Sequence, residues 1–268
     1  MVDIHCHVLP DVDDGSESVV ESLEMMRRAA AGGVKTVIAT PHLIKGMYEI
    51  DFSERQQMTA DLQKAVDENG INIQIRSGVE YYLSPQILED SDKLNEFTLN
   101  NNGKYILVEL PMQIFPTGFG DIIFNLNLKG ISPVLAHPER NVRIYRNPDI
   151  LFDFVKNGLI TQVNAGSIMG NYGRERKKAA QILLVNNLAH VVASDMHSAS
   201  SVTMNQAIPL VEKMVGKERT KQLFIENPRR ILNGEIIHEE PIQIEPERRG
   251  LRGFFSRRKK PRQEYQGK

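Results

Sequence analysis

The chain has 268 residues, of which 41% are hydrophobic and 25% are charged, and its formal net charge is −1. This composition is that of an ordinary globular protein, and α/β barrels of this length commonly form a single domain. The near-neutral charge gives no general argument for a nucleic-acid partner. No apolar run approaches the ~18 residues of a membrane-spanning helix, and no signal peptide is expected at the N-terminus. One cysteine cannot form an internal disulfide, so we expect a cytoplasmic protein.

Short β-rich segments alternate with helical segments along residues 1–237, which we expect to form one domain. Strands are predicted at 2–4, 34–40, 71–80, 105–110, 132–137, 159–164 and 190–194. Helices are predicted at 16–31, 53–70, 85–97, 120–129, 148–157, 174–187, 203–215 and 218–233. The first helix is expected to bury Val19, Val20, Leu23, Met26 and Ala30 on one face. Seven strands separated by helices predict an α/β fold with a parallel sheet closed into a barrel, and an open doubly wound sheet is the alternative.

The first strand ends in an unusual pair of histidines. It reads Asp3-Ile4-His5-Cys6-His7 and is followed by Asp13-Asp14-Gly15. Because side chains alternate along an extended segment, His5 and His7 should point the same way and Cys6 the opposite way, into the core. Two imidazoles with carboxylates nearby suit a transition-metal ion, although a chance pair of histidines in an N-terminal tail is the alternative.

Five histidines and three carboxylates lie at or just after the ends of the predicted strands. They are His5, His7, His42, His137, His197, Glu80, Glu109 and Asp195. In a barrel these strand ends converge on one face, where active sites are built. We therefore predict a multinuclear metal site, whose ligand types suit Mn²⁺, Fe²⁺ or Zn²⁺. The remaining two histidines, His190 and His238, are expected to be structural or solvent-exposed.

Seven short motifs together resemble a known family. They are Asp-Ile-His-Cys-His at 3–7, Asp-Asp-Gly at 13–15, Thr-Pro-His at 40–42, Gly-Val-Glu at 78–80, Val-Glu-Leu at 108–110, Ala-His-Pro-Glu-Arg-Asn at 136–141 and Ala-Ser-Asp-Met-His at 193–197. Their order and spacing resemble the PHP (polymerase and histidinol phosphatase) superfamily. Within it, the likeness is greatest to the manganese-dependent protein tyrosine phosphatases of bacterial capsule and exopolysaccharide operons. The resemblance implies a distorted TIM-like barrel of seven β/α units.

The resemblance also implies two or three Mn²⁺ ions, with Fe²⁺ or Zn²⁺ as alternatives, and assigns their ligands. The first ion would be held by His5, His7, Glu80 and Asp195. The second would share Glu80 and be held also by Glu109 and His137. The third would be held by Asp14, His42 and His197. The sequence alone does not separate Asp14 from its neighbour Asp13.

The chemistry that this resemblance implies is hydrolysis of a phosphomonoester by a metal-bound hydroxide that attacks phosphorus. Arg140 is the candidate catalytic guanidinium, because its planar fork fits a phosphate; a surface salt bridge with Glu139 is the alternative. No Cys-x5-Arg loop is present, so a thiolate mechanism is excluded. Family members often carry a further arginine after the Asp-x-His motif, but residues 198–204 contain none. Arg143, Arg174 and Arg176 are candidates for its role.

The predicted substrate is phosphotyrosine in a protein, by resemblance a membrane-associated tyrosine kinase that controls capsule or exopolysaccharide synthesis. The alternatives are a small-molecule phosphatase, such as one acting on histidinol phosphate, and a non-catalytic PHP scaffold. Residues 238–268 are expected to form a flexible tail, in which 248–262 carry eight basic residues and no acidic one. One interpretation is that this tail makes a weak contact with an anionic membrane or with the kinase, which would place the protein at the inner face of the membrane. The alternative is that the tail is a solvated extension. Nucleic acid is the less favoured partner.

Overall fold

The computed structural model of the protein describes residues 1–90, 92–238 and 240–244, and its strands form two parallel sheets. The first sheet contains β1 (Val2–Cys6), β2 (Thr36–Ala39) and β4 (Gln74–Ser77). The second contains β3 (His42–Leu43), β5 (Glu80–Tyr82), β6 (Tyr105–Glu109), β7 (Ser132–Ala136), β8 (Ile160–Asn164) and β9 (Val191–Ala193), paired in that order. The predicted α/β fold with parallel strands is confirmed.

The two sheets are joined into a ring of seven strand positions. Strand β3 begins just beyond the predicted strand 34–40 that contains β2, and β5 begins at the last residue of the predicted strand 71–80 that contains β4. Glu80 N donates to Pro41 O (3.0 Å) across the break. At the other end of the ring, His7 N donates to Met196 O (2.9 Å) and Asp195 N donates to His5 O (3.0 Å). Neighbouring strands follow the chain order without the reversal of a doubly wound sheet, which agrees with a distorted barrel. The contact of β1 with the segment after β9 is a single bridge rather than a strand ladder.

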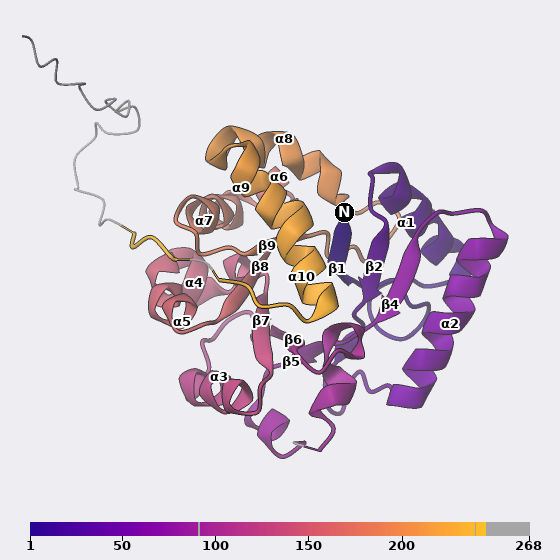
Figure 1. Ribbon diagram of the computed structural model, residues 1–268, viewed down its shortest axis with the longest axis horizontal. Coiled ribbons are helices and arrows are strands. Elements are labelled where there is room, and N and C mark those ends of the chain that lie inside the picture. The colour runs from indigo at the N-terminus through magenta and orange to yellow at the C-terminus, as the bar shows by residue number, and fades with distance from the viewer. Residues whose placement is uncertain (91, 239, 245–268) are drawn as a thin grey trace, which may run out of the picture.

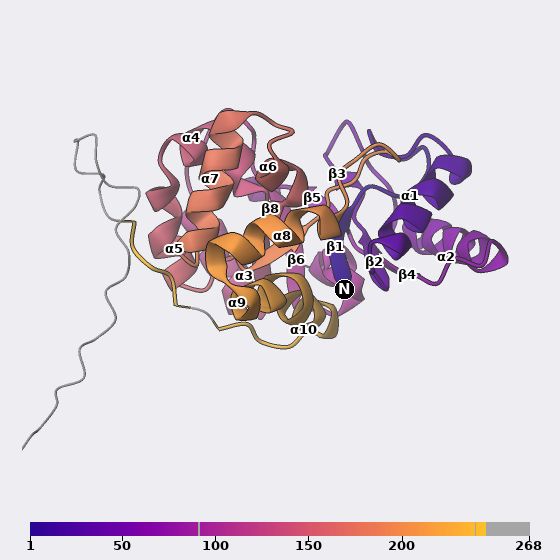
Figure 2. The ribbon, with the colours of Figure 1, turned by 90° about the horizontal axis from the view of Figure 1, so that it is seen from above.

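Helices surround the strands on the outside (Figures 1 and 2). They are α1 (Val19–Ala31), α2 (Phe52–Glu68), α3 (Phe119–Leu128), α4 (Val142–Arg146), α5 (Phe152–Lys156), α6 (Ala165–Met169), α7 (Arg174–Val185), α8 (Met204–Val215), α9 (Lys217–Lys221) and α10 (Asn227–Asn233). Short 3₁₀ turns lie at Pro85–Leu88, Leu94–Phe97, Leu99–Asn101, Pro138–Arg140 and Pro148–Leu151, and a π-helical turn lies at Gln222–Glu226. Within the part of the chain that the structure describes, no helix has the length and apolar character needed to cross a bilayer.

Two helix predictions require correction. Val19 and Val20 are 45% and 76% exposed, so they do not belong to the buried face of α1. Leu23 and Met26 are buried as predicted, together with Met25 and Ala29. The predicted helix over 85–97 is replaced by two separate 3₁₀ turns. The segment between them contains Glu89, Asp90 and Asp92, whose like charges and low average helix propensity disfavour a continuous helix.

Apolar side chains form two layers on the two faces of the strands. An inner cluster contains strand residues such as Val134 and Val191, and Ile231 of α10 joins it. Helix α10 lies beside the amino-terminal end of β6, where Tyr105 OH donates to Glu235 O (2.6 Å). A larger outer cluster, which includes Cys6, packs the strands against the surrounding helices, so the predicted burial of Cys6 is confirmed. Because apolar side chains pack inside and around the strands, the polar residues gather at the carboxyl ends of the strands.

The basic segment 248–262 lies outside the described residues. The predicted contact of this tail with a membrane or a kinase therefore stays a prediction.

Candidate metal centre

All nine predicted metal ligands lie together at the carboxyl ends of the strands. They form four overlapping groups in which the potential ligand atoms lie within 4.8 Å of one another. The groups are His7, Asp14, His42 and His197; His5, His7 and Glu80; His5, His137 and Asp195; and His42, Glu80 and Glu109. Residues separated by up to 192 positions in the sequence thus meet in one small volume, as the barrel topology predicts.

Glu80 lies at the centre of the cluster and offers one oxygen to each side. Its Oε2 lies 3.3 Å from Nε2 of both His5 and His7, and 2.9 Å from Nδ1 of His42. Its Oε1 lies 2.9 Å from Nε2 of His137, which is 3.7 Å from Glu109 Oε1. This arrangement is suited to a carboxylate that bridges two ions. His42 lies close to Glu80 as well as to Asp14, so the structure does not divide the residues into three separate sets.

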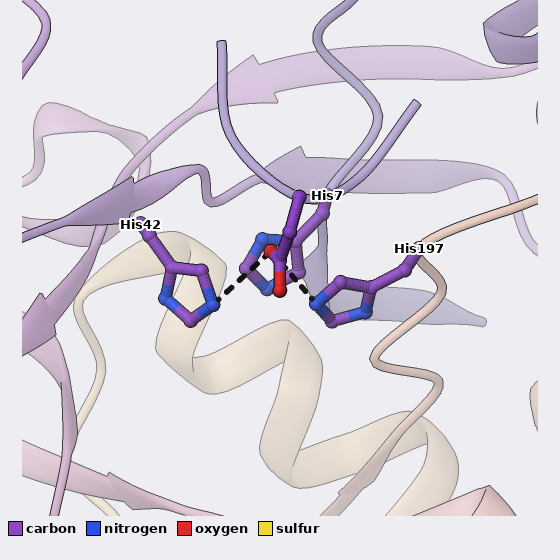
Figure 3. A group of neighbouring side chains, drawn as sticks. His7, His42 and His197 are labelled. Atoms are coloured by element: carbon purple, nitrogen blue, oxygen red, sulfur yellow. Dashed lines mark ion pairs between the residues drawn. The ribbon is translucent and has the colours of Figure 1, made fainter. Parts of the chain in front are cut away.

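Three imidazoles surround the carboxylate of Asp14 (Figure 3). Nε2 of His42 and Nε2 of His197 each lie 3.4 Å from Asp14 Oδ1. The rings of His7 and His197 stack with their centroids 3.9 Å apart. Asp14 is half-exposed, so this end of the cluster is open to solvent, whereas His5 and Glu80 are fully buried.

Asp13 has a different position from Asp14. Its Oδ2 lies 2.7 Å from His7 Nδ1 and accepts the backbone N–H of His42 (2.8 Å), while its Oδ1 accepts the N–H of Gly15 (2.9 Å). A carboxylate on Nδ1 fixes the tautomer and ring orientation of a histidine whose Nε2 faces a metal. The geometry therefore favours Asp14 as the ligand and Asp13 as the residue that orients His7.

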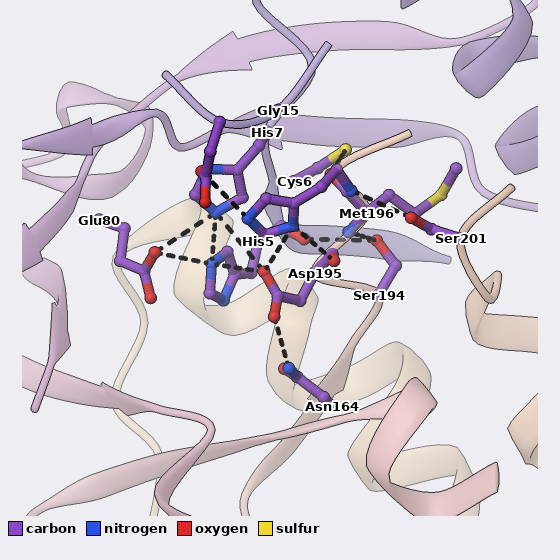
Figure 4. A network of polar contacts seen from close by, with 12 residues as sticks. His5, Cys6, His7, Gly15, Glu80, Asn164, Ser194, Asp195, Met196 and Ser201 are labelled. Carbon is purple, nitrogen blue, oxygen red and sulfur yellow. Dashed lines mark hydrogen bonds and ion pairs between the residues drawn. The ribbon is translucent and has the colours of Figure 1, made fainter. Parts of the chain in front are cut away.

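Local backbone irregularities direct several of these side chains. The register of β1 against β2 shifts between Asp3 and Cys6. Without this shift, Ile4 and Cys6 would face the same side of the strand. Instead, Ile4 belongs to the inner apolar cluster and Cys6 to the outer one. His5 and His7 both reach the metal centre (Figure 4). Such bulges re-aim side chains beside active sites.

Two candidate ligands have backbone angles in the left-handed region. These are His137 (φ 28°) and Asp195 (φ 55°). Ala136 belongs to the inner cluster, so plain alternation would turn His137 outward; its unusual φ accompanies a ring that faces Glu80. Strained φ values of this kind concentrate at functional sites.

Two residues of β8 support the cluster, although this strand supplies none of the nine candidate ligands. Gln162 Oε1 lies 2.9 Å from His5 Nδ1, and Gln162 Nε2 donates to Asn164 Oδ1 (2.7 Å). Asn164 Nδ2 in turn donates to Asp195 Oδ2 (2.5 Å; Figure 4). Sequence reasoning missed both residues, although two polar side chains at i and i+2 in a buried strand were a usable signal.

Arg140 joins the same network. Its Nη1 donates to Asp195 Oδ2 (3.0 Å), and its guanidinium lies 4.8 Å from the ring centroid of Tyr172. Glu139 is fully buried instead and accepts the N–H of Asn164 (2.9 Å), so the alternative of a surface salt bridge between Arg140 and Glu139 is wrong. Tyr172 had no sequence signal, because it reaches Arg140 from the loop after α6.

The other candidate arginines lie elsewhere. Arg176 stacks on Tyr145, with 4.8 Å between the guanidinium and the ring centroid, and Arg143 lines a separate cavity. Arg174 is exposed at the start of α7. His190 is buried and its Nδ1 accepts the N–H of Thr161 (3.1 Å), and His238 is exposed, which agrees with their predicted structural or solvent-exposed character.

The ionisation of the cluster reflects its burial and charge. Burial lowers the pKa of His5, but Glu80 and Asp195 outweigh this effect and raise the pKa to about 9. Burial opposes ionisation of Glu80, but the surrounding imidazoles hold its pKa well below the usual range. Burial, reinforced by Glu80, raises the pKa of Glu109 to about 7. Burial, reinforced by Arg140, lowers the pKa of His137 to about 4. The buried carboxylates thus favour a proton on His5, whereas burial favours the neutral form of His137.

Three buried atoms of the cluster make no hydrogen bond of suitable geometry within the described residues: His42 Nδ1, Glu80 Oε2 and Asp195 Oδ1, although His42 Nδ1 and Glu80 Oε2 lie 2.9 Å apart. The second oxygen of Asp195 is already occupied by Asn164 and Arg140. Buried polar atoms without partners are costly unless an ion or water satisfies them. The donor set, with imidazoles and carboxylates and no thiolate, fits Mn²⁺, Fe²⁺ or Zn²⁺.

A ring of parallel strands with clustered imidazoles and carboxylates at its carboxyl ends defines the class of barrel-like α/β proteins with a metal-binding site on that face. Residues 1–233 match the family described as "Capsular polysaccharide synthesis, CpsB/CapC", and the chain belongs to this family. The resemblance seen in the sequence is thus confirmed.

Named relatives and a crystal structure agree. The chain is 36% identical over 257 residues to tyrosine-protein phosphatase YwqE of Bacillus subtilis, covering 95% of this chain and 100% of that protein. It is 32% identical over 244 residues to tyrosine-protein phosphatase CpsB of Streptococcus pneumoniae, covering 88% and 100%. A crystal structure from work on these two proteins, described there as metal-dependent tyrosine phosphatases, matches with a TM-score of 0.87 and 34% identity, covering 92% and 100%.

Proposed function

We propose that this protein is a metal-dependent tyrosine-protein phosphatase that acts on a phosphotyrosine protein in the synthesis of capsular polysaccharide or exopolysaccharide. The observation that carries the proposal is the meeting of nine imidazole and carboxylate side chains at one end of the strands. The names of the relatives YwqE and CpsB supply the substrate class.

The nine side chains would hold two or three ions, which we propose to be manganese. His5, His7, Glu80 and Asp195 would hold the first, Glu80, Glu109 and His137 the second, and Asp14, His42 and His197 the third. Bound manganese would lower the pKa of a coordinated water toward ~7 and would supply positive charge against the phosphoryl oxygens. Glu80 can serve two ions because its two oxygens face different imidazoles.

Arg140 would bind the phosphate. Its Nη1 is committed to Asp195 and its plane rests on Tyr172, so its orientation is fixed while its other N–H groups remain for phosphoryl oxygens. Charge on the equatorial oxygens in the transition state is what such a guanidinium stabilises. A tyrosine leaving group has a conjugate-acid pKa of ~10 and therefore requires less protonation than an alkoxide.

The partner that we propose is a membrane-associated tyrosine kinase, and we propose that the phosphatase works in the cytoplasm, near the inner face of the membrane. The family's link to capsular polysaccharide synthesis supports a phosphoprotein substrate in that process. The basic segment 248–262 would contribute a weak attraction to anionic lipid, worth about 1 kcal/mol per basic residue close to the surface.

The test compares two substrates on the same preparation. Hydrolysis of a phosphotyrosine peptide and of histidinol phosphate is measured with added Mn²⁺, Fe²⁺ or Zn²⁺, before and after chelation. We expect fast release of phosphate from the peptide with Mn²⁺, loss after chelation, and recovery when the ion returns. Faster hydrolysis of histidinol phosphate would instead support a small-molecule phosphatase. Hydrolysis of neither substrate in metal-loaded protein would support a scaffold.

A further inference from the structure

A cavity of about 730 Å³ lies beside the metal centre. The strands β3 and β5 supply both sites: His42 and Glu80 belong to the cluster, and the residues that follow them, Leu43 and Tyr81, line the cavity. Tyr82 also lines the cavity, and it is the register partner of Glu109 in the pairing of β5 with β6. The cavity and the site at which we propose that phosphotyrosine is hydrolysed are thus built on neighbouring residues of the same two strands.

The hairpin after β3 connects the two sites on the other side. Ile44 and Tyr48 exchange backbone hydrogen bonds of 2.8 and 2.9 Å, and the Tyr48 ring stacks on His42 with 6.0 Å between centroids. Ile44 and Glu49 of the same hairpin line the cavity. The hairpin thus contacts the cluster through Tyr48 and lines the cavity through Ile44 and Glu49. We expect a peptide whose phosphotyrosine reaches the cluster to lie beside this hairpin.

The cavity is acidic. Its lining includes five carboxylates, Glu49, Asp51, Glu54, Asp90 and Glu96, against two ammonium groups, Lys45 and Lys93. Arg55 lies beside Glu96 and offsets part of this charge, yet carboxylates remain in excess. Asp51 and Glu54, at the start of α2, are exposed, and the Asp51 side chain makes no capping hydrogen bond. The charge is opposite to that of the neighbouring site, where Arg140 and bound cations would receive a phosphate.

We propose that this acidic cavity binds the peptide segment next to the phosphotyrosine and selects substrates in which that segment carries lysine or arginine. The inference rests on the proposed phosphatase function and names a feature of its protein substrate. Complementary charge outside a catalytic centre contributes selectivity and faster association. Tyr81 and Tyr82 both line the cavity, and an aromatic ring there would contact the aliphatic part of such a side chain.

The experiment uses the full chain loaded with Mn²⁺ and three phosphotyrosine peptides that differ only at the two residues on each side, which are lysine, alanine or glutamate. The quantity compared is the ratio of kcat/KM between peptides. We expect the lysine peptide to exceed the glutamate peptide by about tenfold at low salt, and the ratio to fall as sodium chloride is added.

Two double variants locate the effect. Asp51→Asn with Glu54→Gln removes two charges from the cavity and keeps a good capping residue, and we expect the lysine-to-glutamate ratio to fall about three- to tenfold. Asp61→Asn with Glu68→Gln makes the same changes further along α2, outside the cavity, and should leave the ratio as in the wild type. Because each ratio is taken within one preparation, a partly inactive variant is still informative.

The outcomes are distinct. Equal kcat/KM for the three peptides, or an equal effect of the two double variants, would overturn the acidic subsite while leaving the phosphatase function intact. Absence of hydrolysis for all three peptides, in protein that hydrolyses another phosphomonoester, would overturn the proposed protein substrate and the subsite with it.

Discussion

At the scale of single residues, Arg140 links the metal centre to the substrate. It donates to Asp195, which itself lies 3.3 Å from His5 Nε2. Asp195 Oδ2 also accepts from Asn164, so Asp195 keeps its geometry if Arg140 is lost. The guanidinium can therefore be removed without dismantling the cluster.

We predict that Arg140→Ala lowers kcat on a phosphotyrosine peptide by about 10²–10³, because a positioned donor to the developing charge is lost. Arg140→Lys should recover only part of the rate, since lysine cannot reproduce the bidentate fork. The matched control is Arg143→Ala, an exposed arginine three positions away. The measurement is steady-state kcat for each variant, compared with the wild type at a measured manganese content. A wild-type kcat in Arg140→Ala would show that this residue has no role in the mechanism.

Gly15 is the second residue with a clear requirement. A Cβ at this position would lie 2.4 Å from His7 O and 2.5 Å from His7 Cβ (Figure 4). Contacts this short force the loop away from β1, and Asp13 and Asp14 move with it. This close approach explains why glycine ends the Asp-Asp-Gly motif.

We predict that Gly15→Ala binds one Mn²⁺ fewer per chain, because Asp14 no longer meets His42 and His197. Elemental analysis after equilibration with Mn²⁺ gives the count, and circular dichroism verifies the fold. Gly120→Ala is the control, since its Cβ would be at an ordinary 3.4 Å from Phe154. A full complement of manganese in Gly15→Ala would show that the loop adapts without losing the site.

At the scale of elements, β8 acts as the support of the centre. Gln162 holds Nδ1 of His5, and Asn164 holds one oxygen of Asp195, so the opposite atoms, Nε2 and Oδ1, face the cluster. Partners of this kind tune metal affinity even though they do not touch the ion.

Asn164→Ala is therefore expected to weaken Mn²⁺ binding by about 10- to 100-fold. Thr161→Val on the same strand is the control: its hydroxyl donates to Leu188 O, so its loss should reduce thermal stability and leave the affinity unchanged. Isothermal titration of Mn²⁺ into each variant measures the difference. Equal affinities for Asn164→Ala and the wild type would assign β8 a purely structural role.

The site was predictable because six of the seven β-rich runs end within two residues of a histidine or carboxylate, and parallel strands bring their carboxyl ends together. The directions in which individual side chains point were harder to predict from the sequence. His5 depends on the register shift in β1, which accompanies hydrogen bonds from Ser194 N and His5 N to Asp3 Oδ1 (3.0 and 3.4 Å). His137 depends on a left-handed φ. Both features are set by distant contacts that alternation along one strand does not contain. The prediction of a helix at 85–97 was wrong for a local reason, namely the acidic residues in the middle of this segment.

At the scale of the whole molecule, the apolar and polar parts of the fold have separate tasks. The inner and outer apolar clusters hold the strands, whereas the polar cluster occupies the carboxyl ends. Glu80 and Asp195 raise the pKa of His5, so a proton on this imidazole offsets part of the negative charge of the cluster.

Metal binding should consequently release protons. The pKa of His5 is raised to about 9 in the metal-free protein, so this imidazole carries a proton near neutral pH that Mn²⁺ must displace. The affinity for Mn²⁺ is therefore expected to increase as the pH rises from about 6 to about 9. Calorimetry in buffers of different ionisation enthalpy counts the protons released. Binding near neutral pH without proton release would contradict this ionisation state.

The most direct test of the central claim is anomalous diffraction from a crystal grown with Mn²⁺. We expect two or three manganese peaks within coordination distance of the nine side chains, with Glu80 between two of them and Asp14 beside His42 and His197. Manganese peaks elsewhere on the molecule, with these nine side chains bound to no ion, would contradict it.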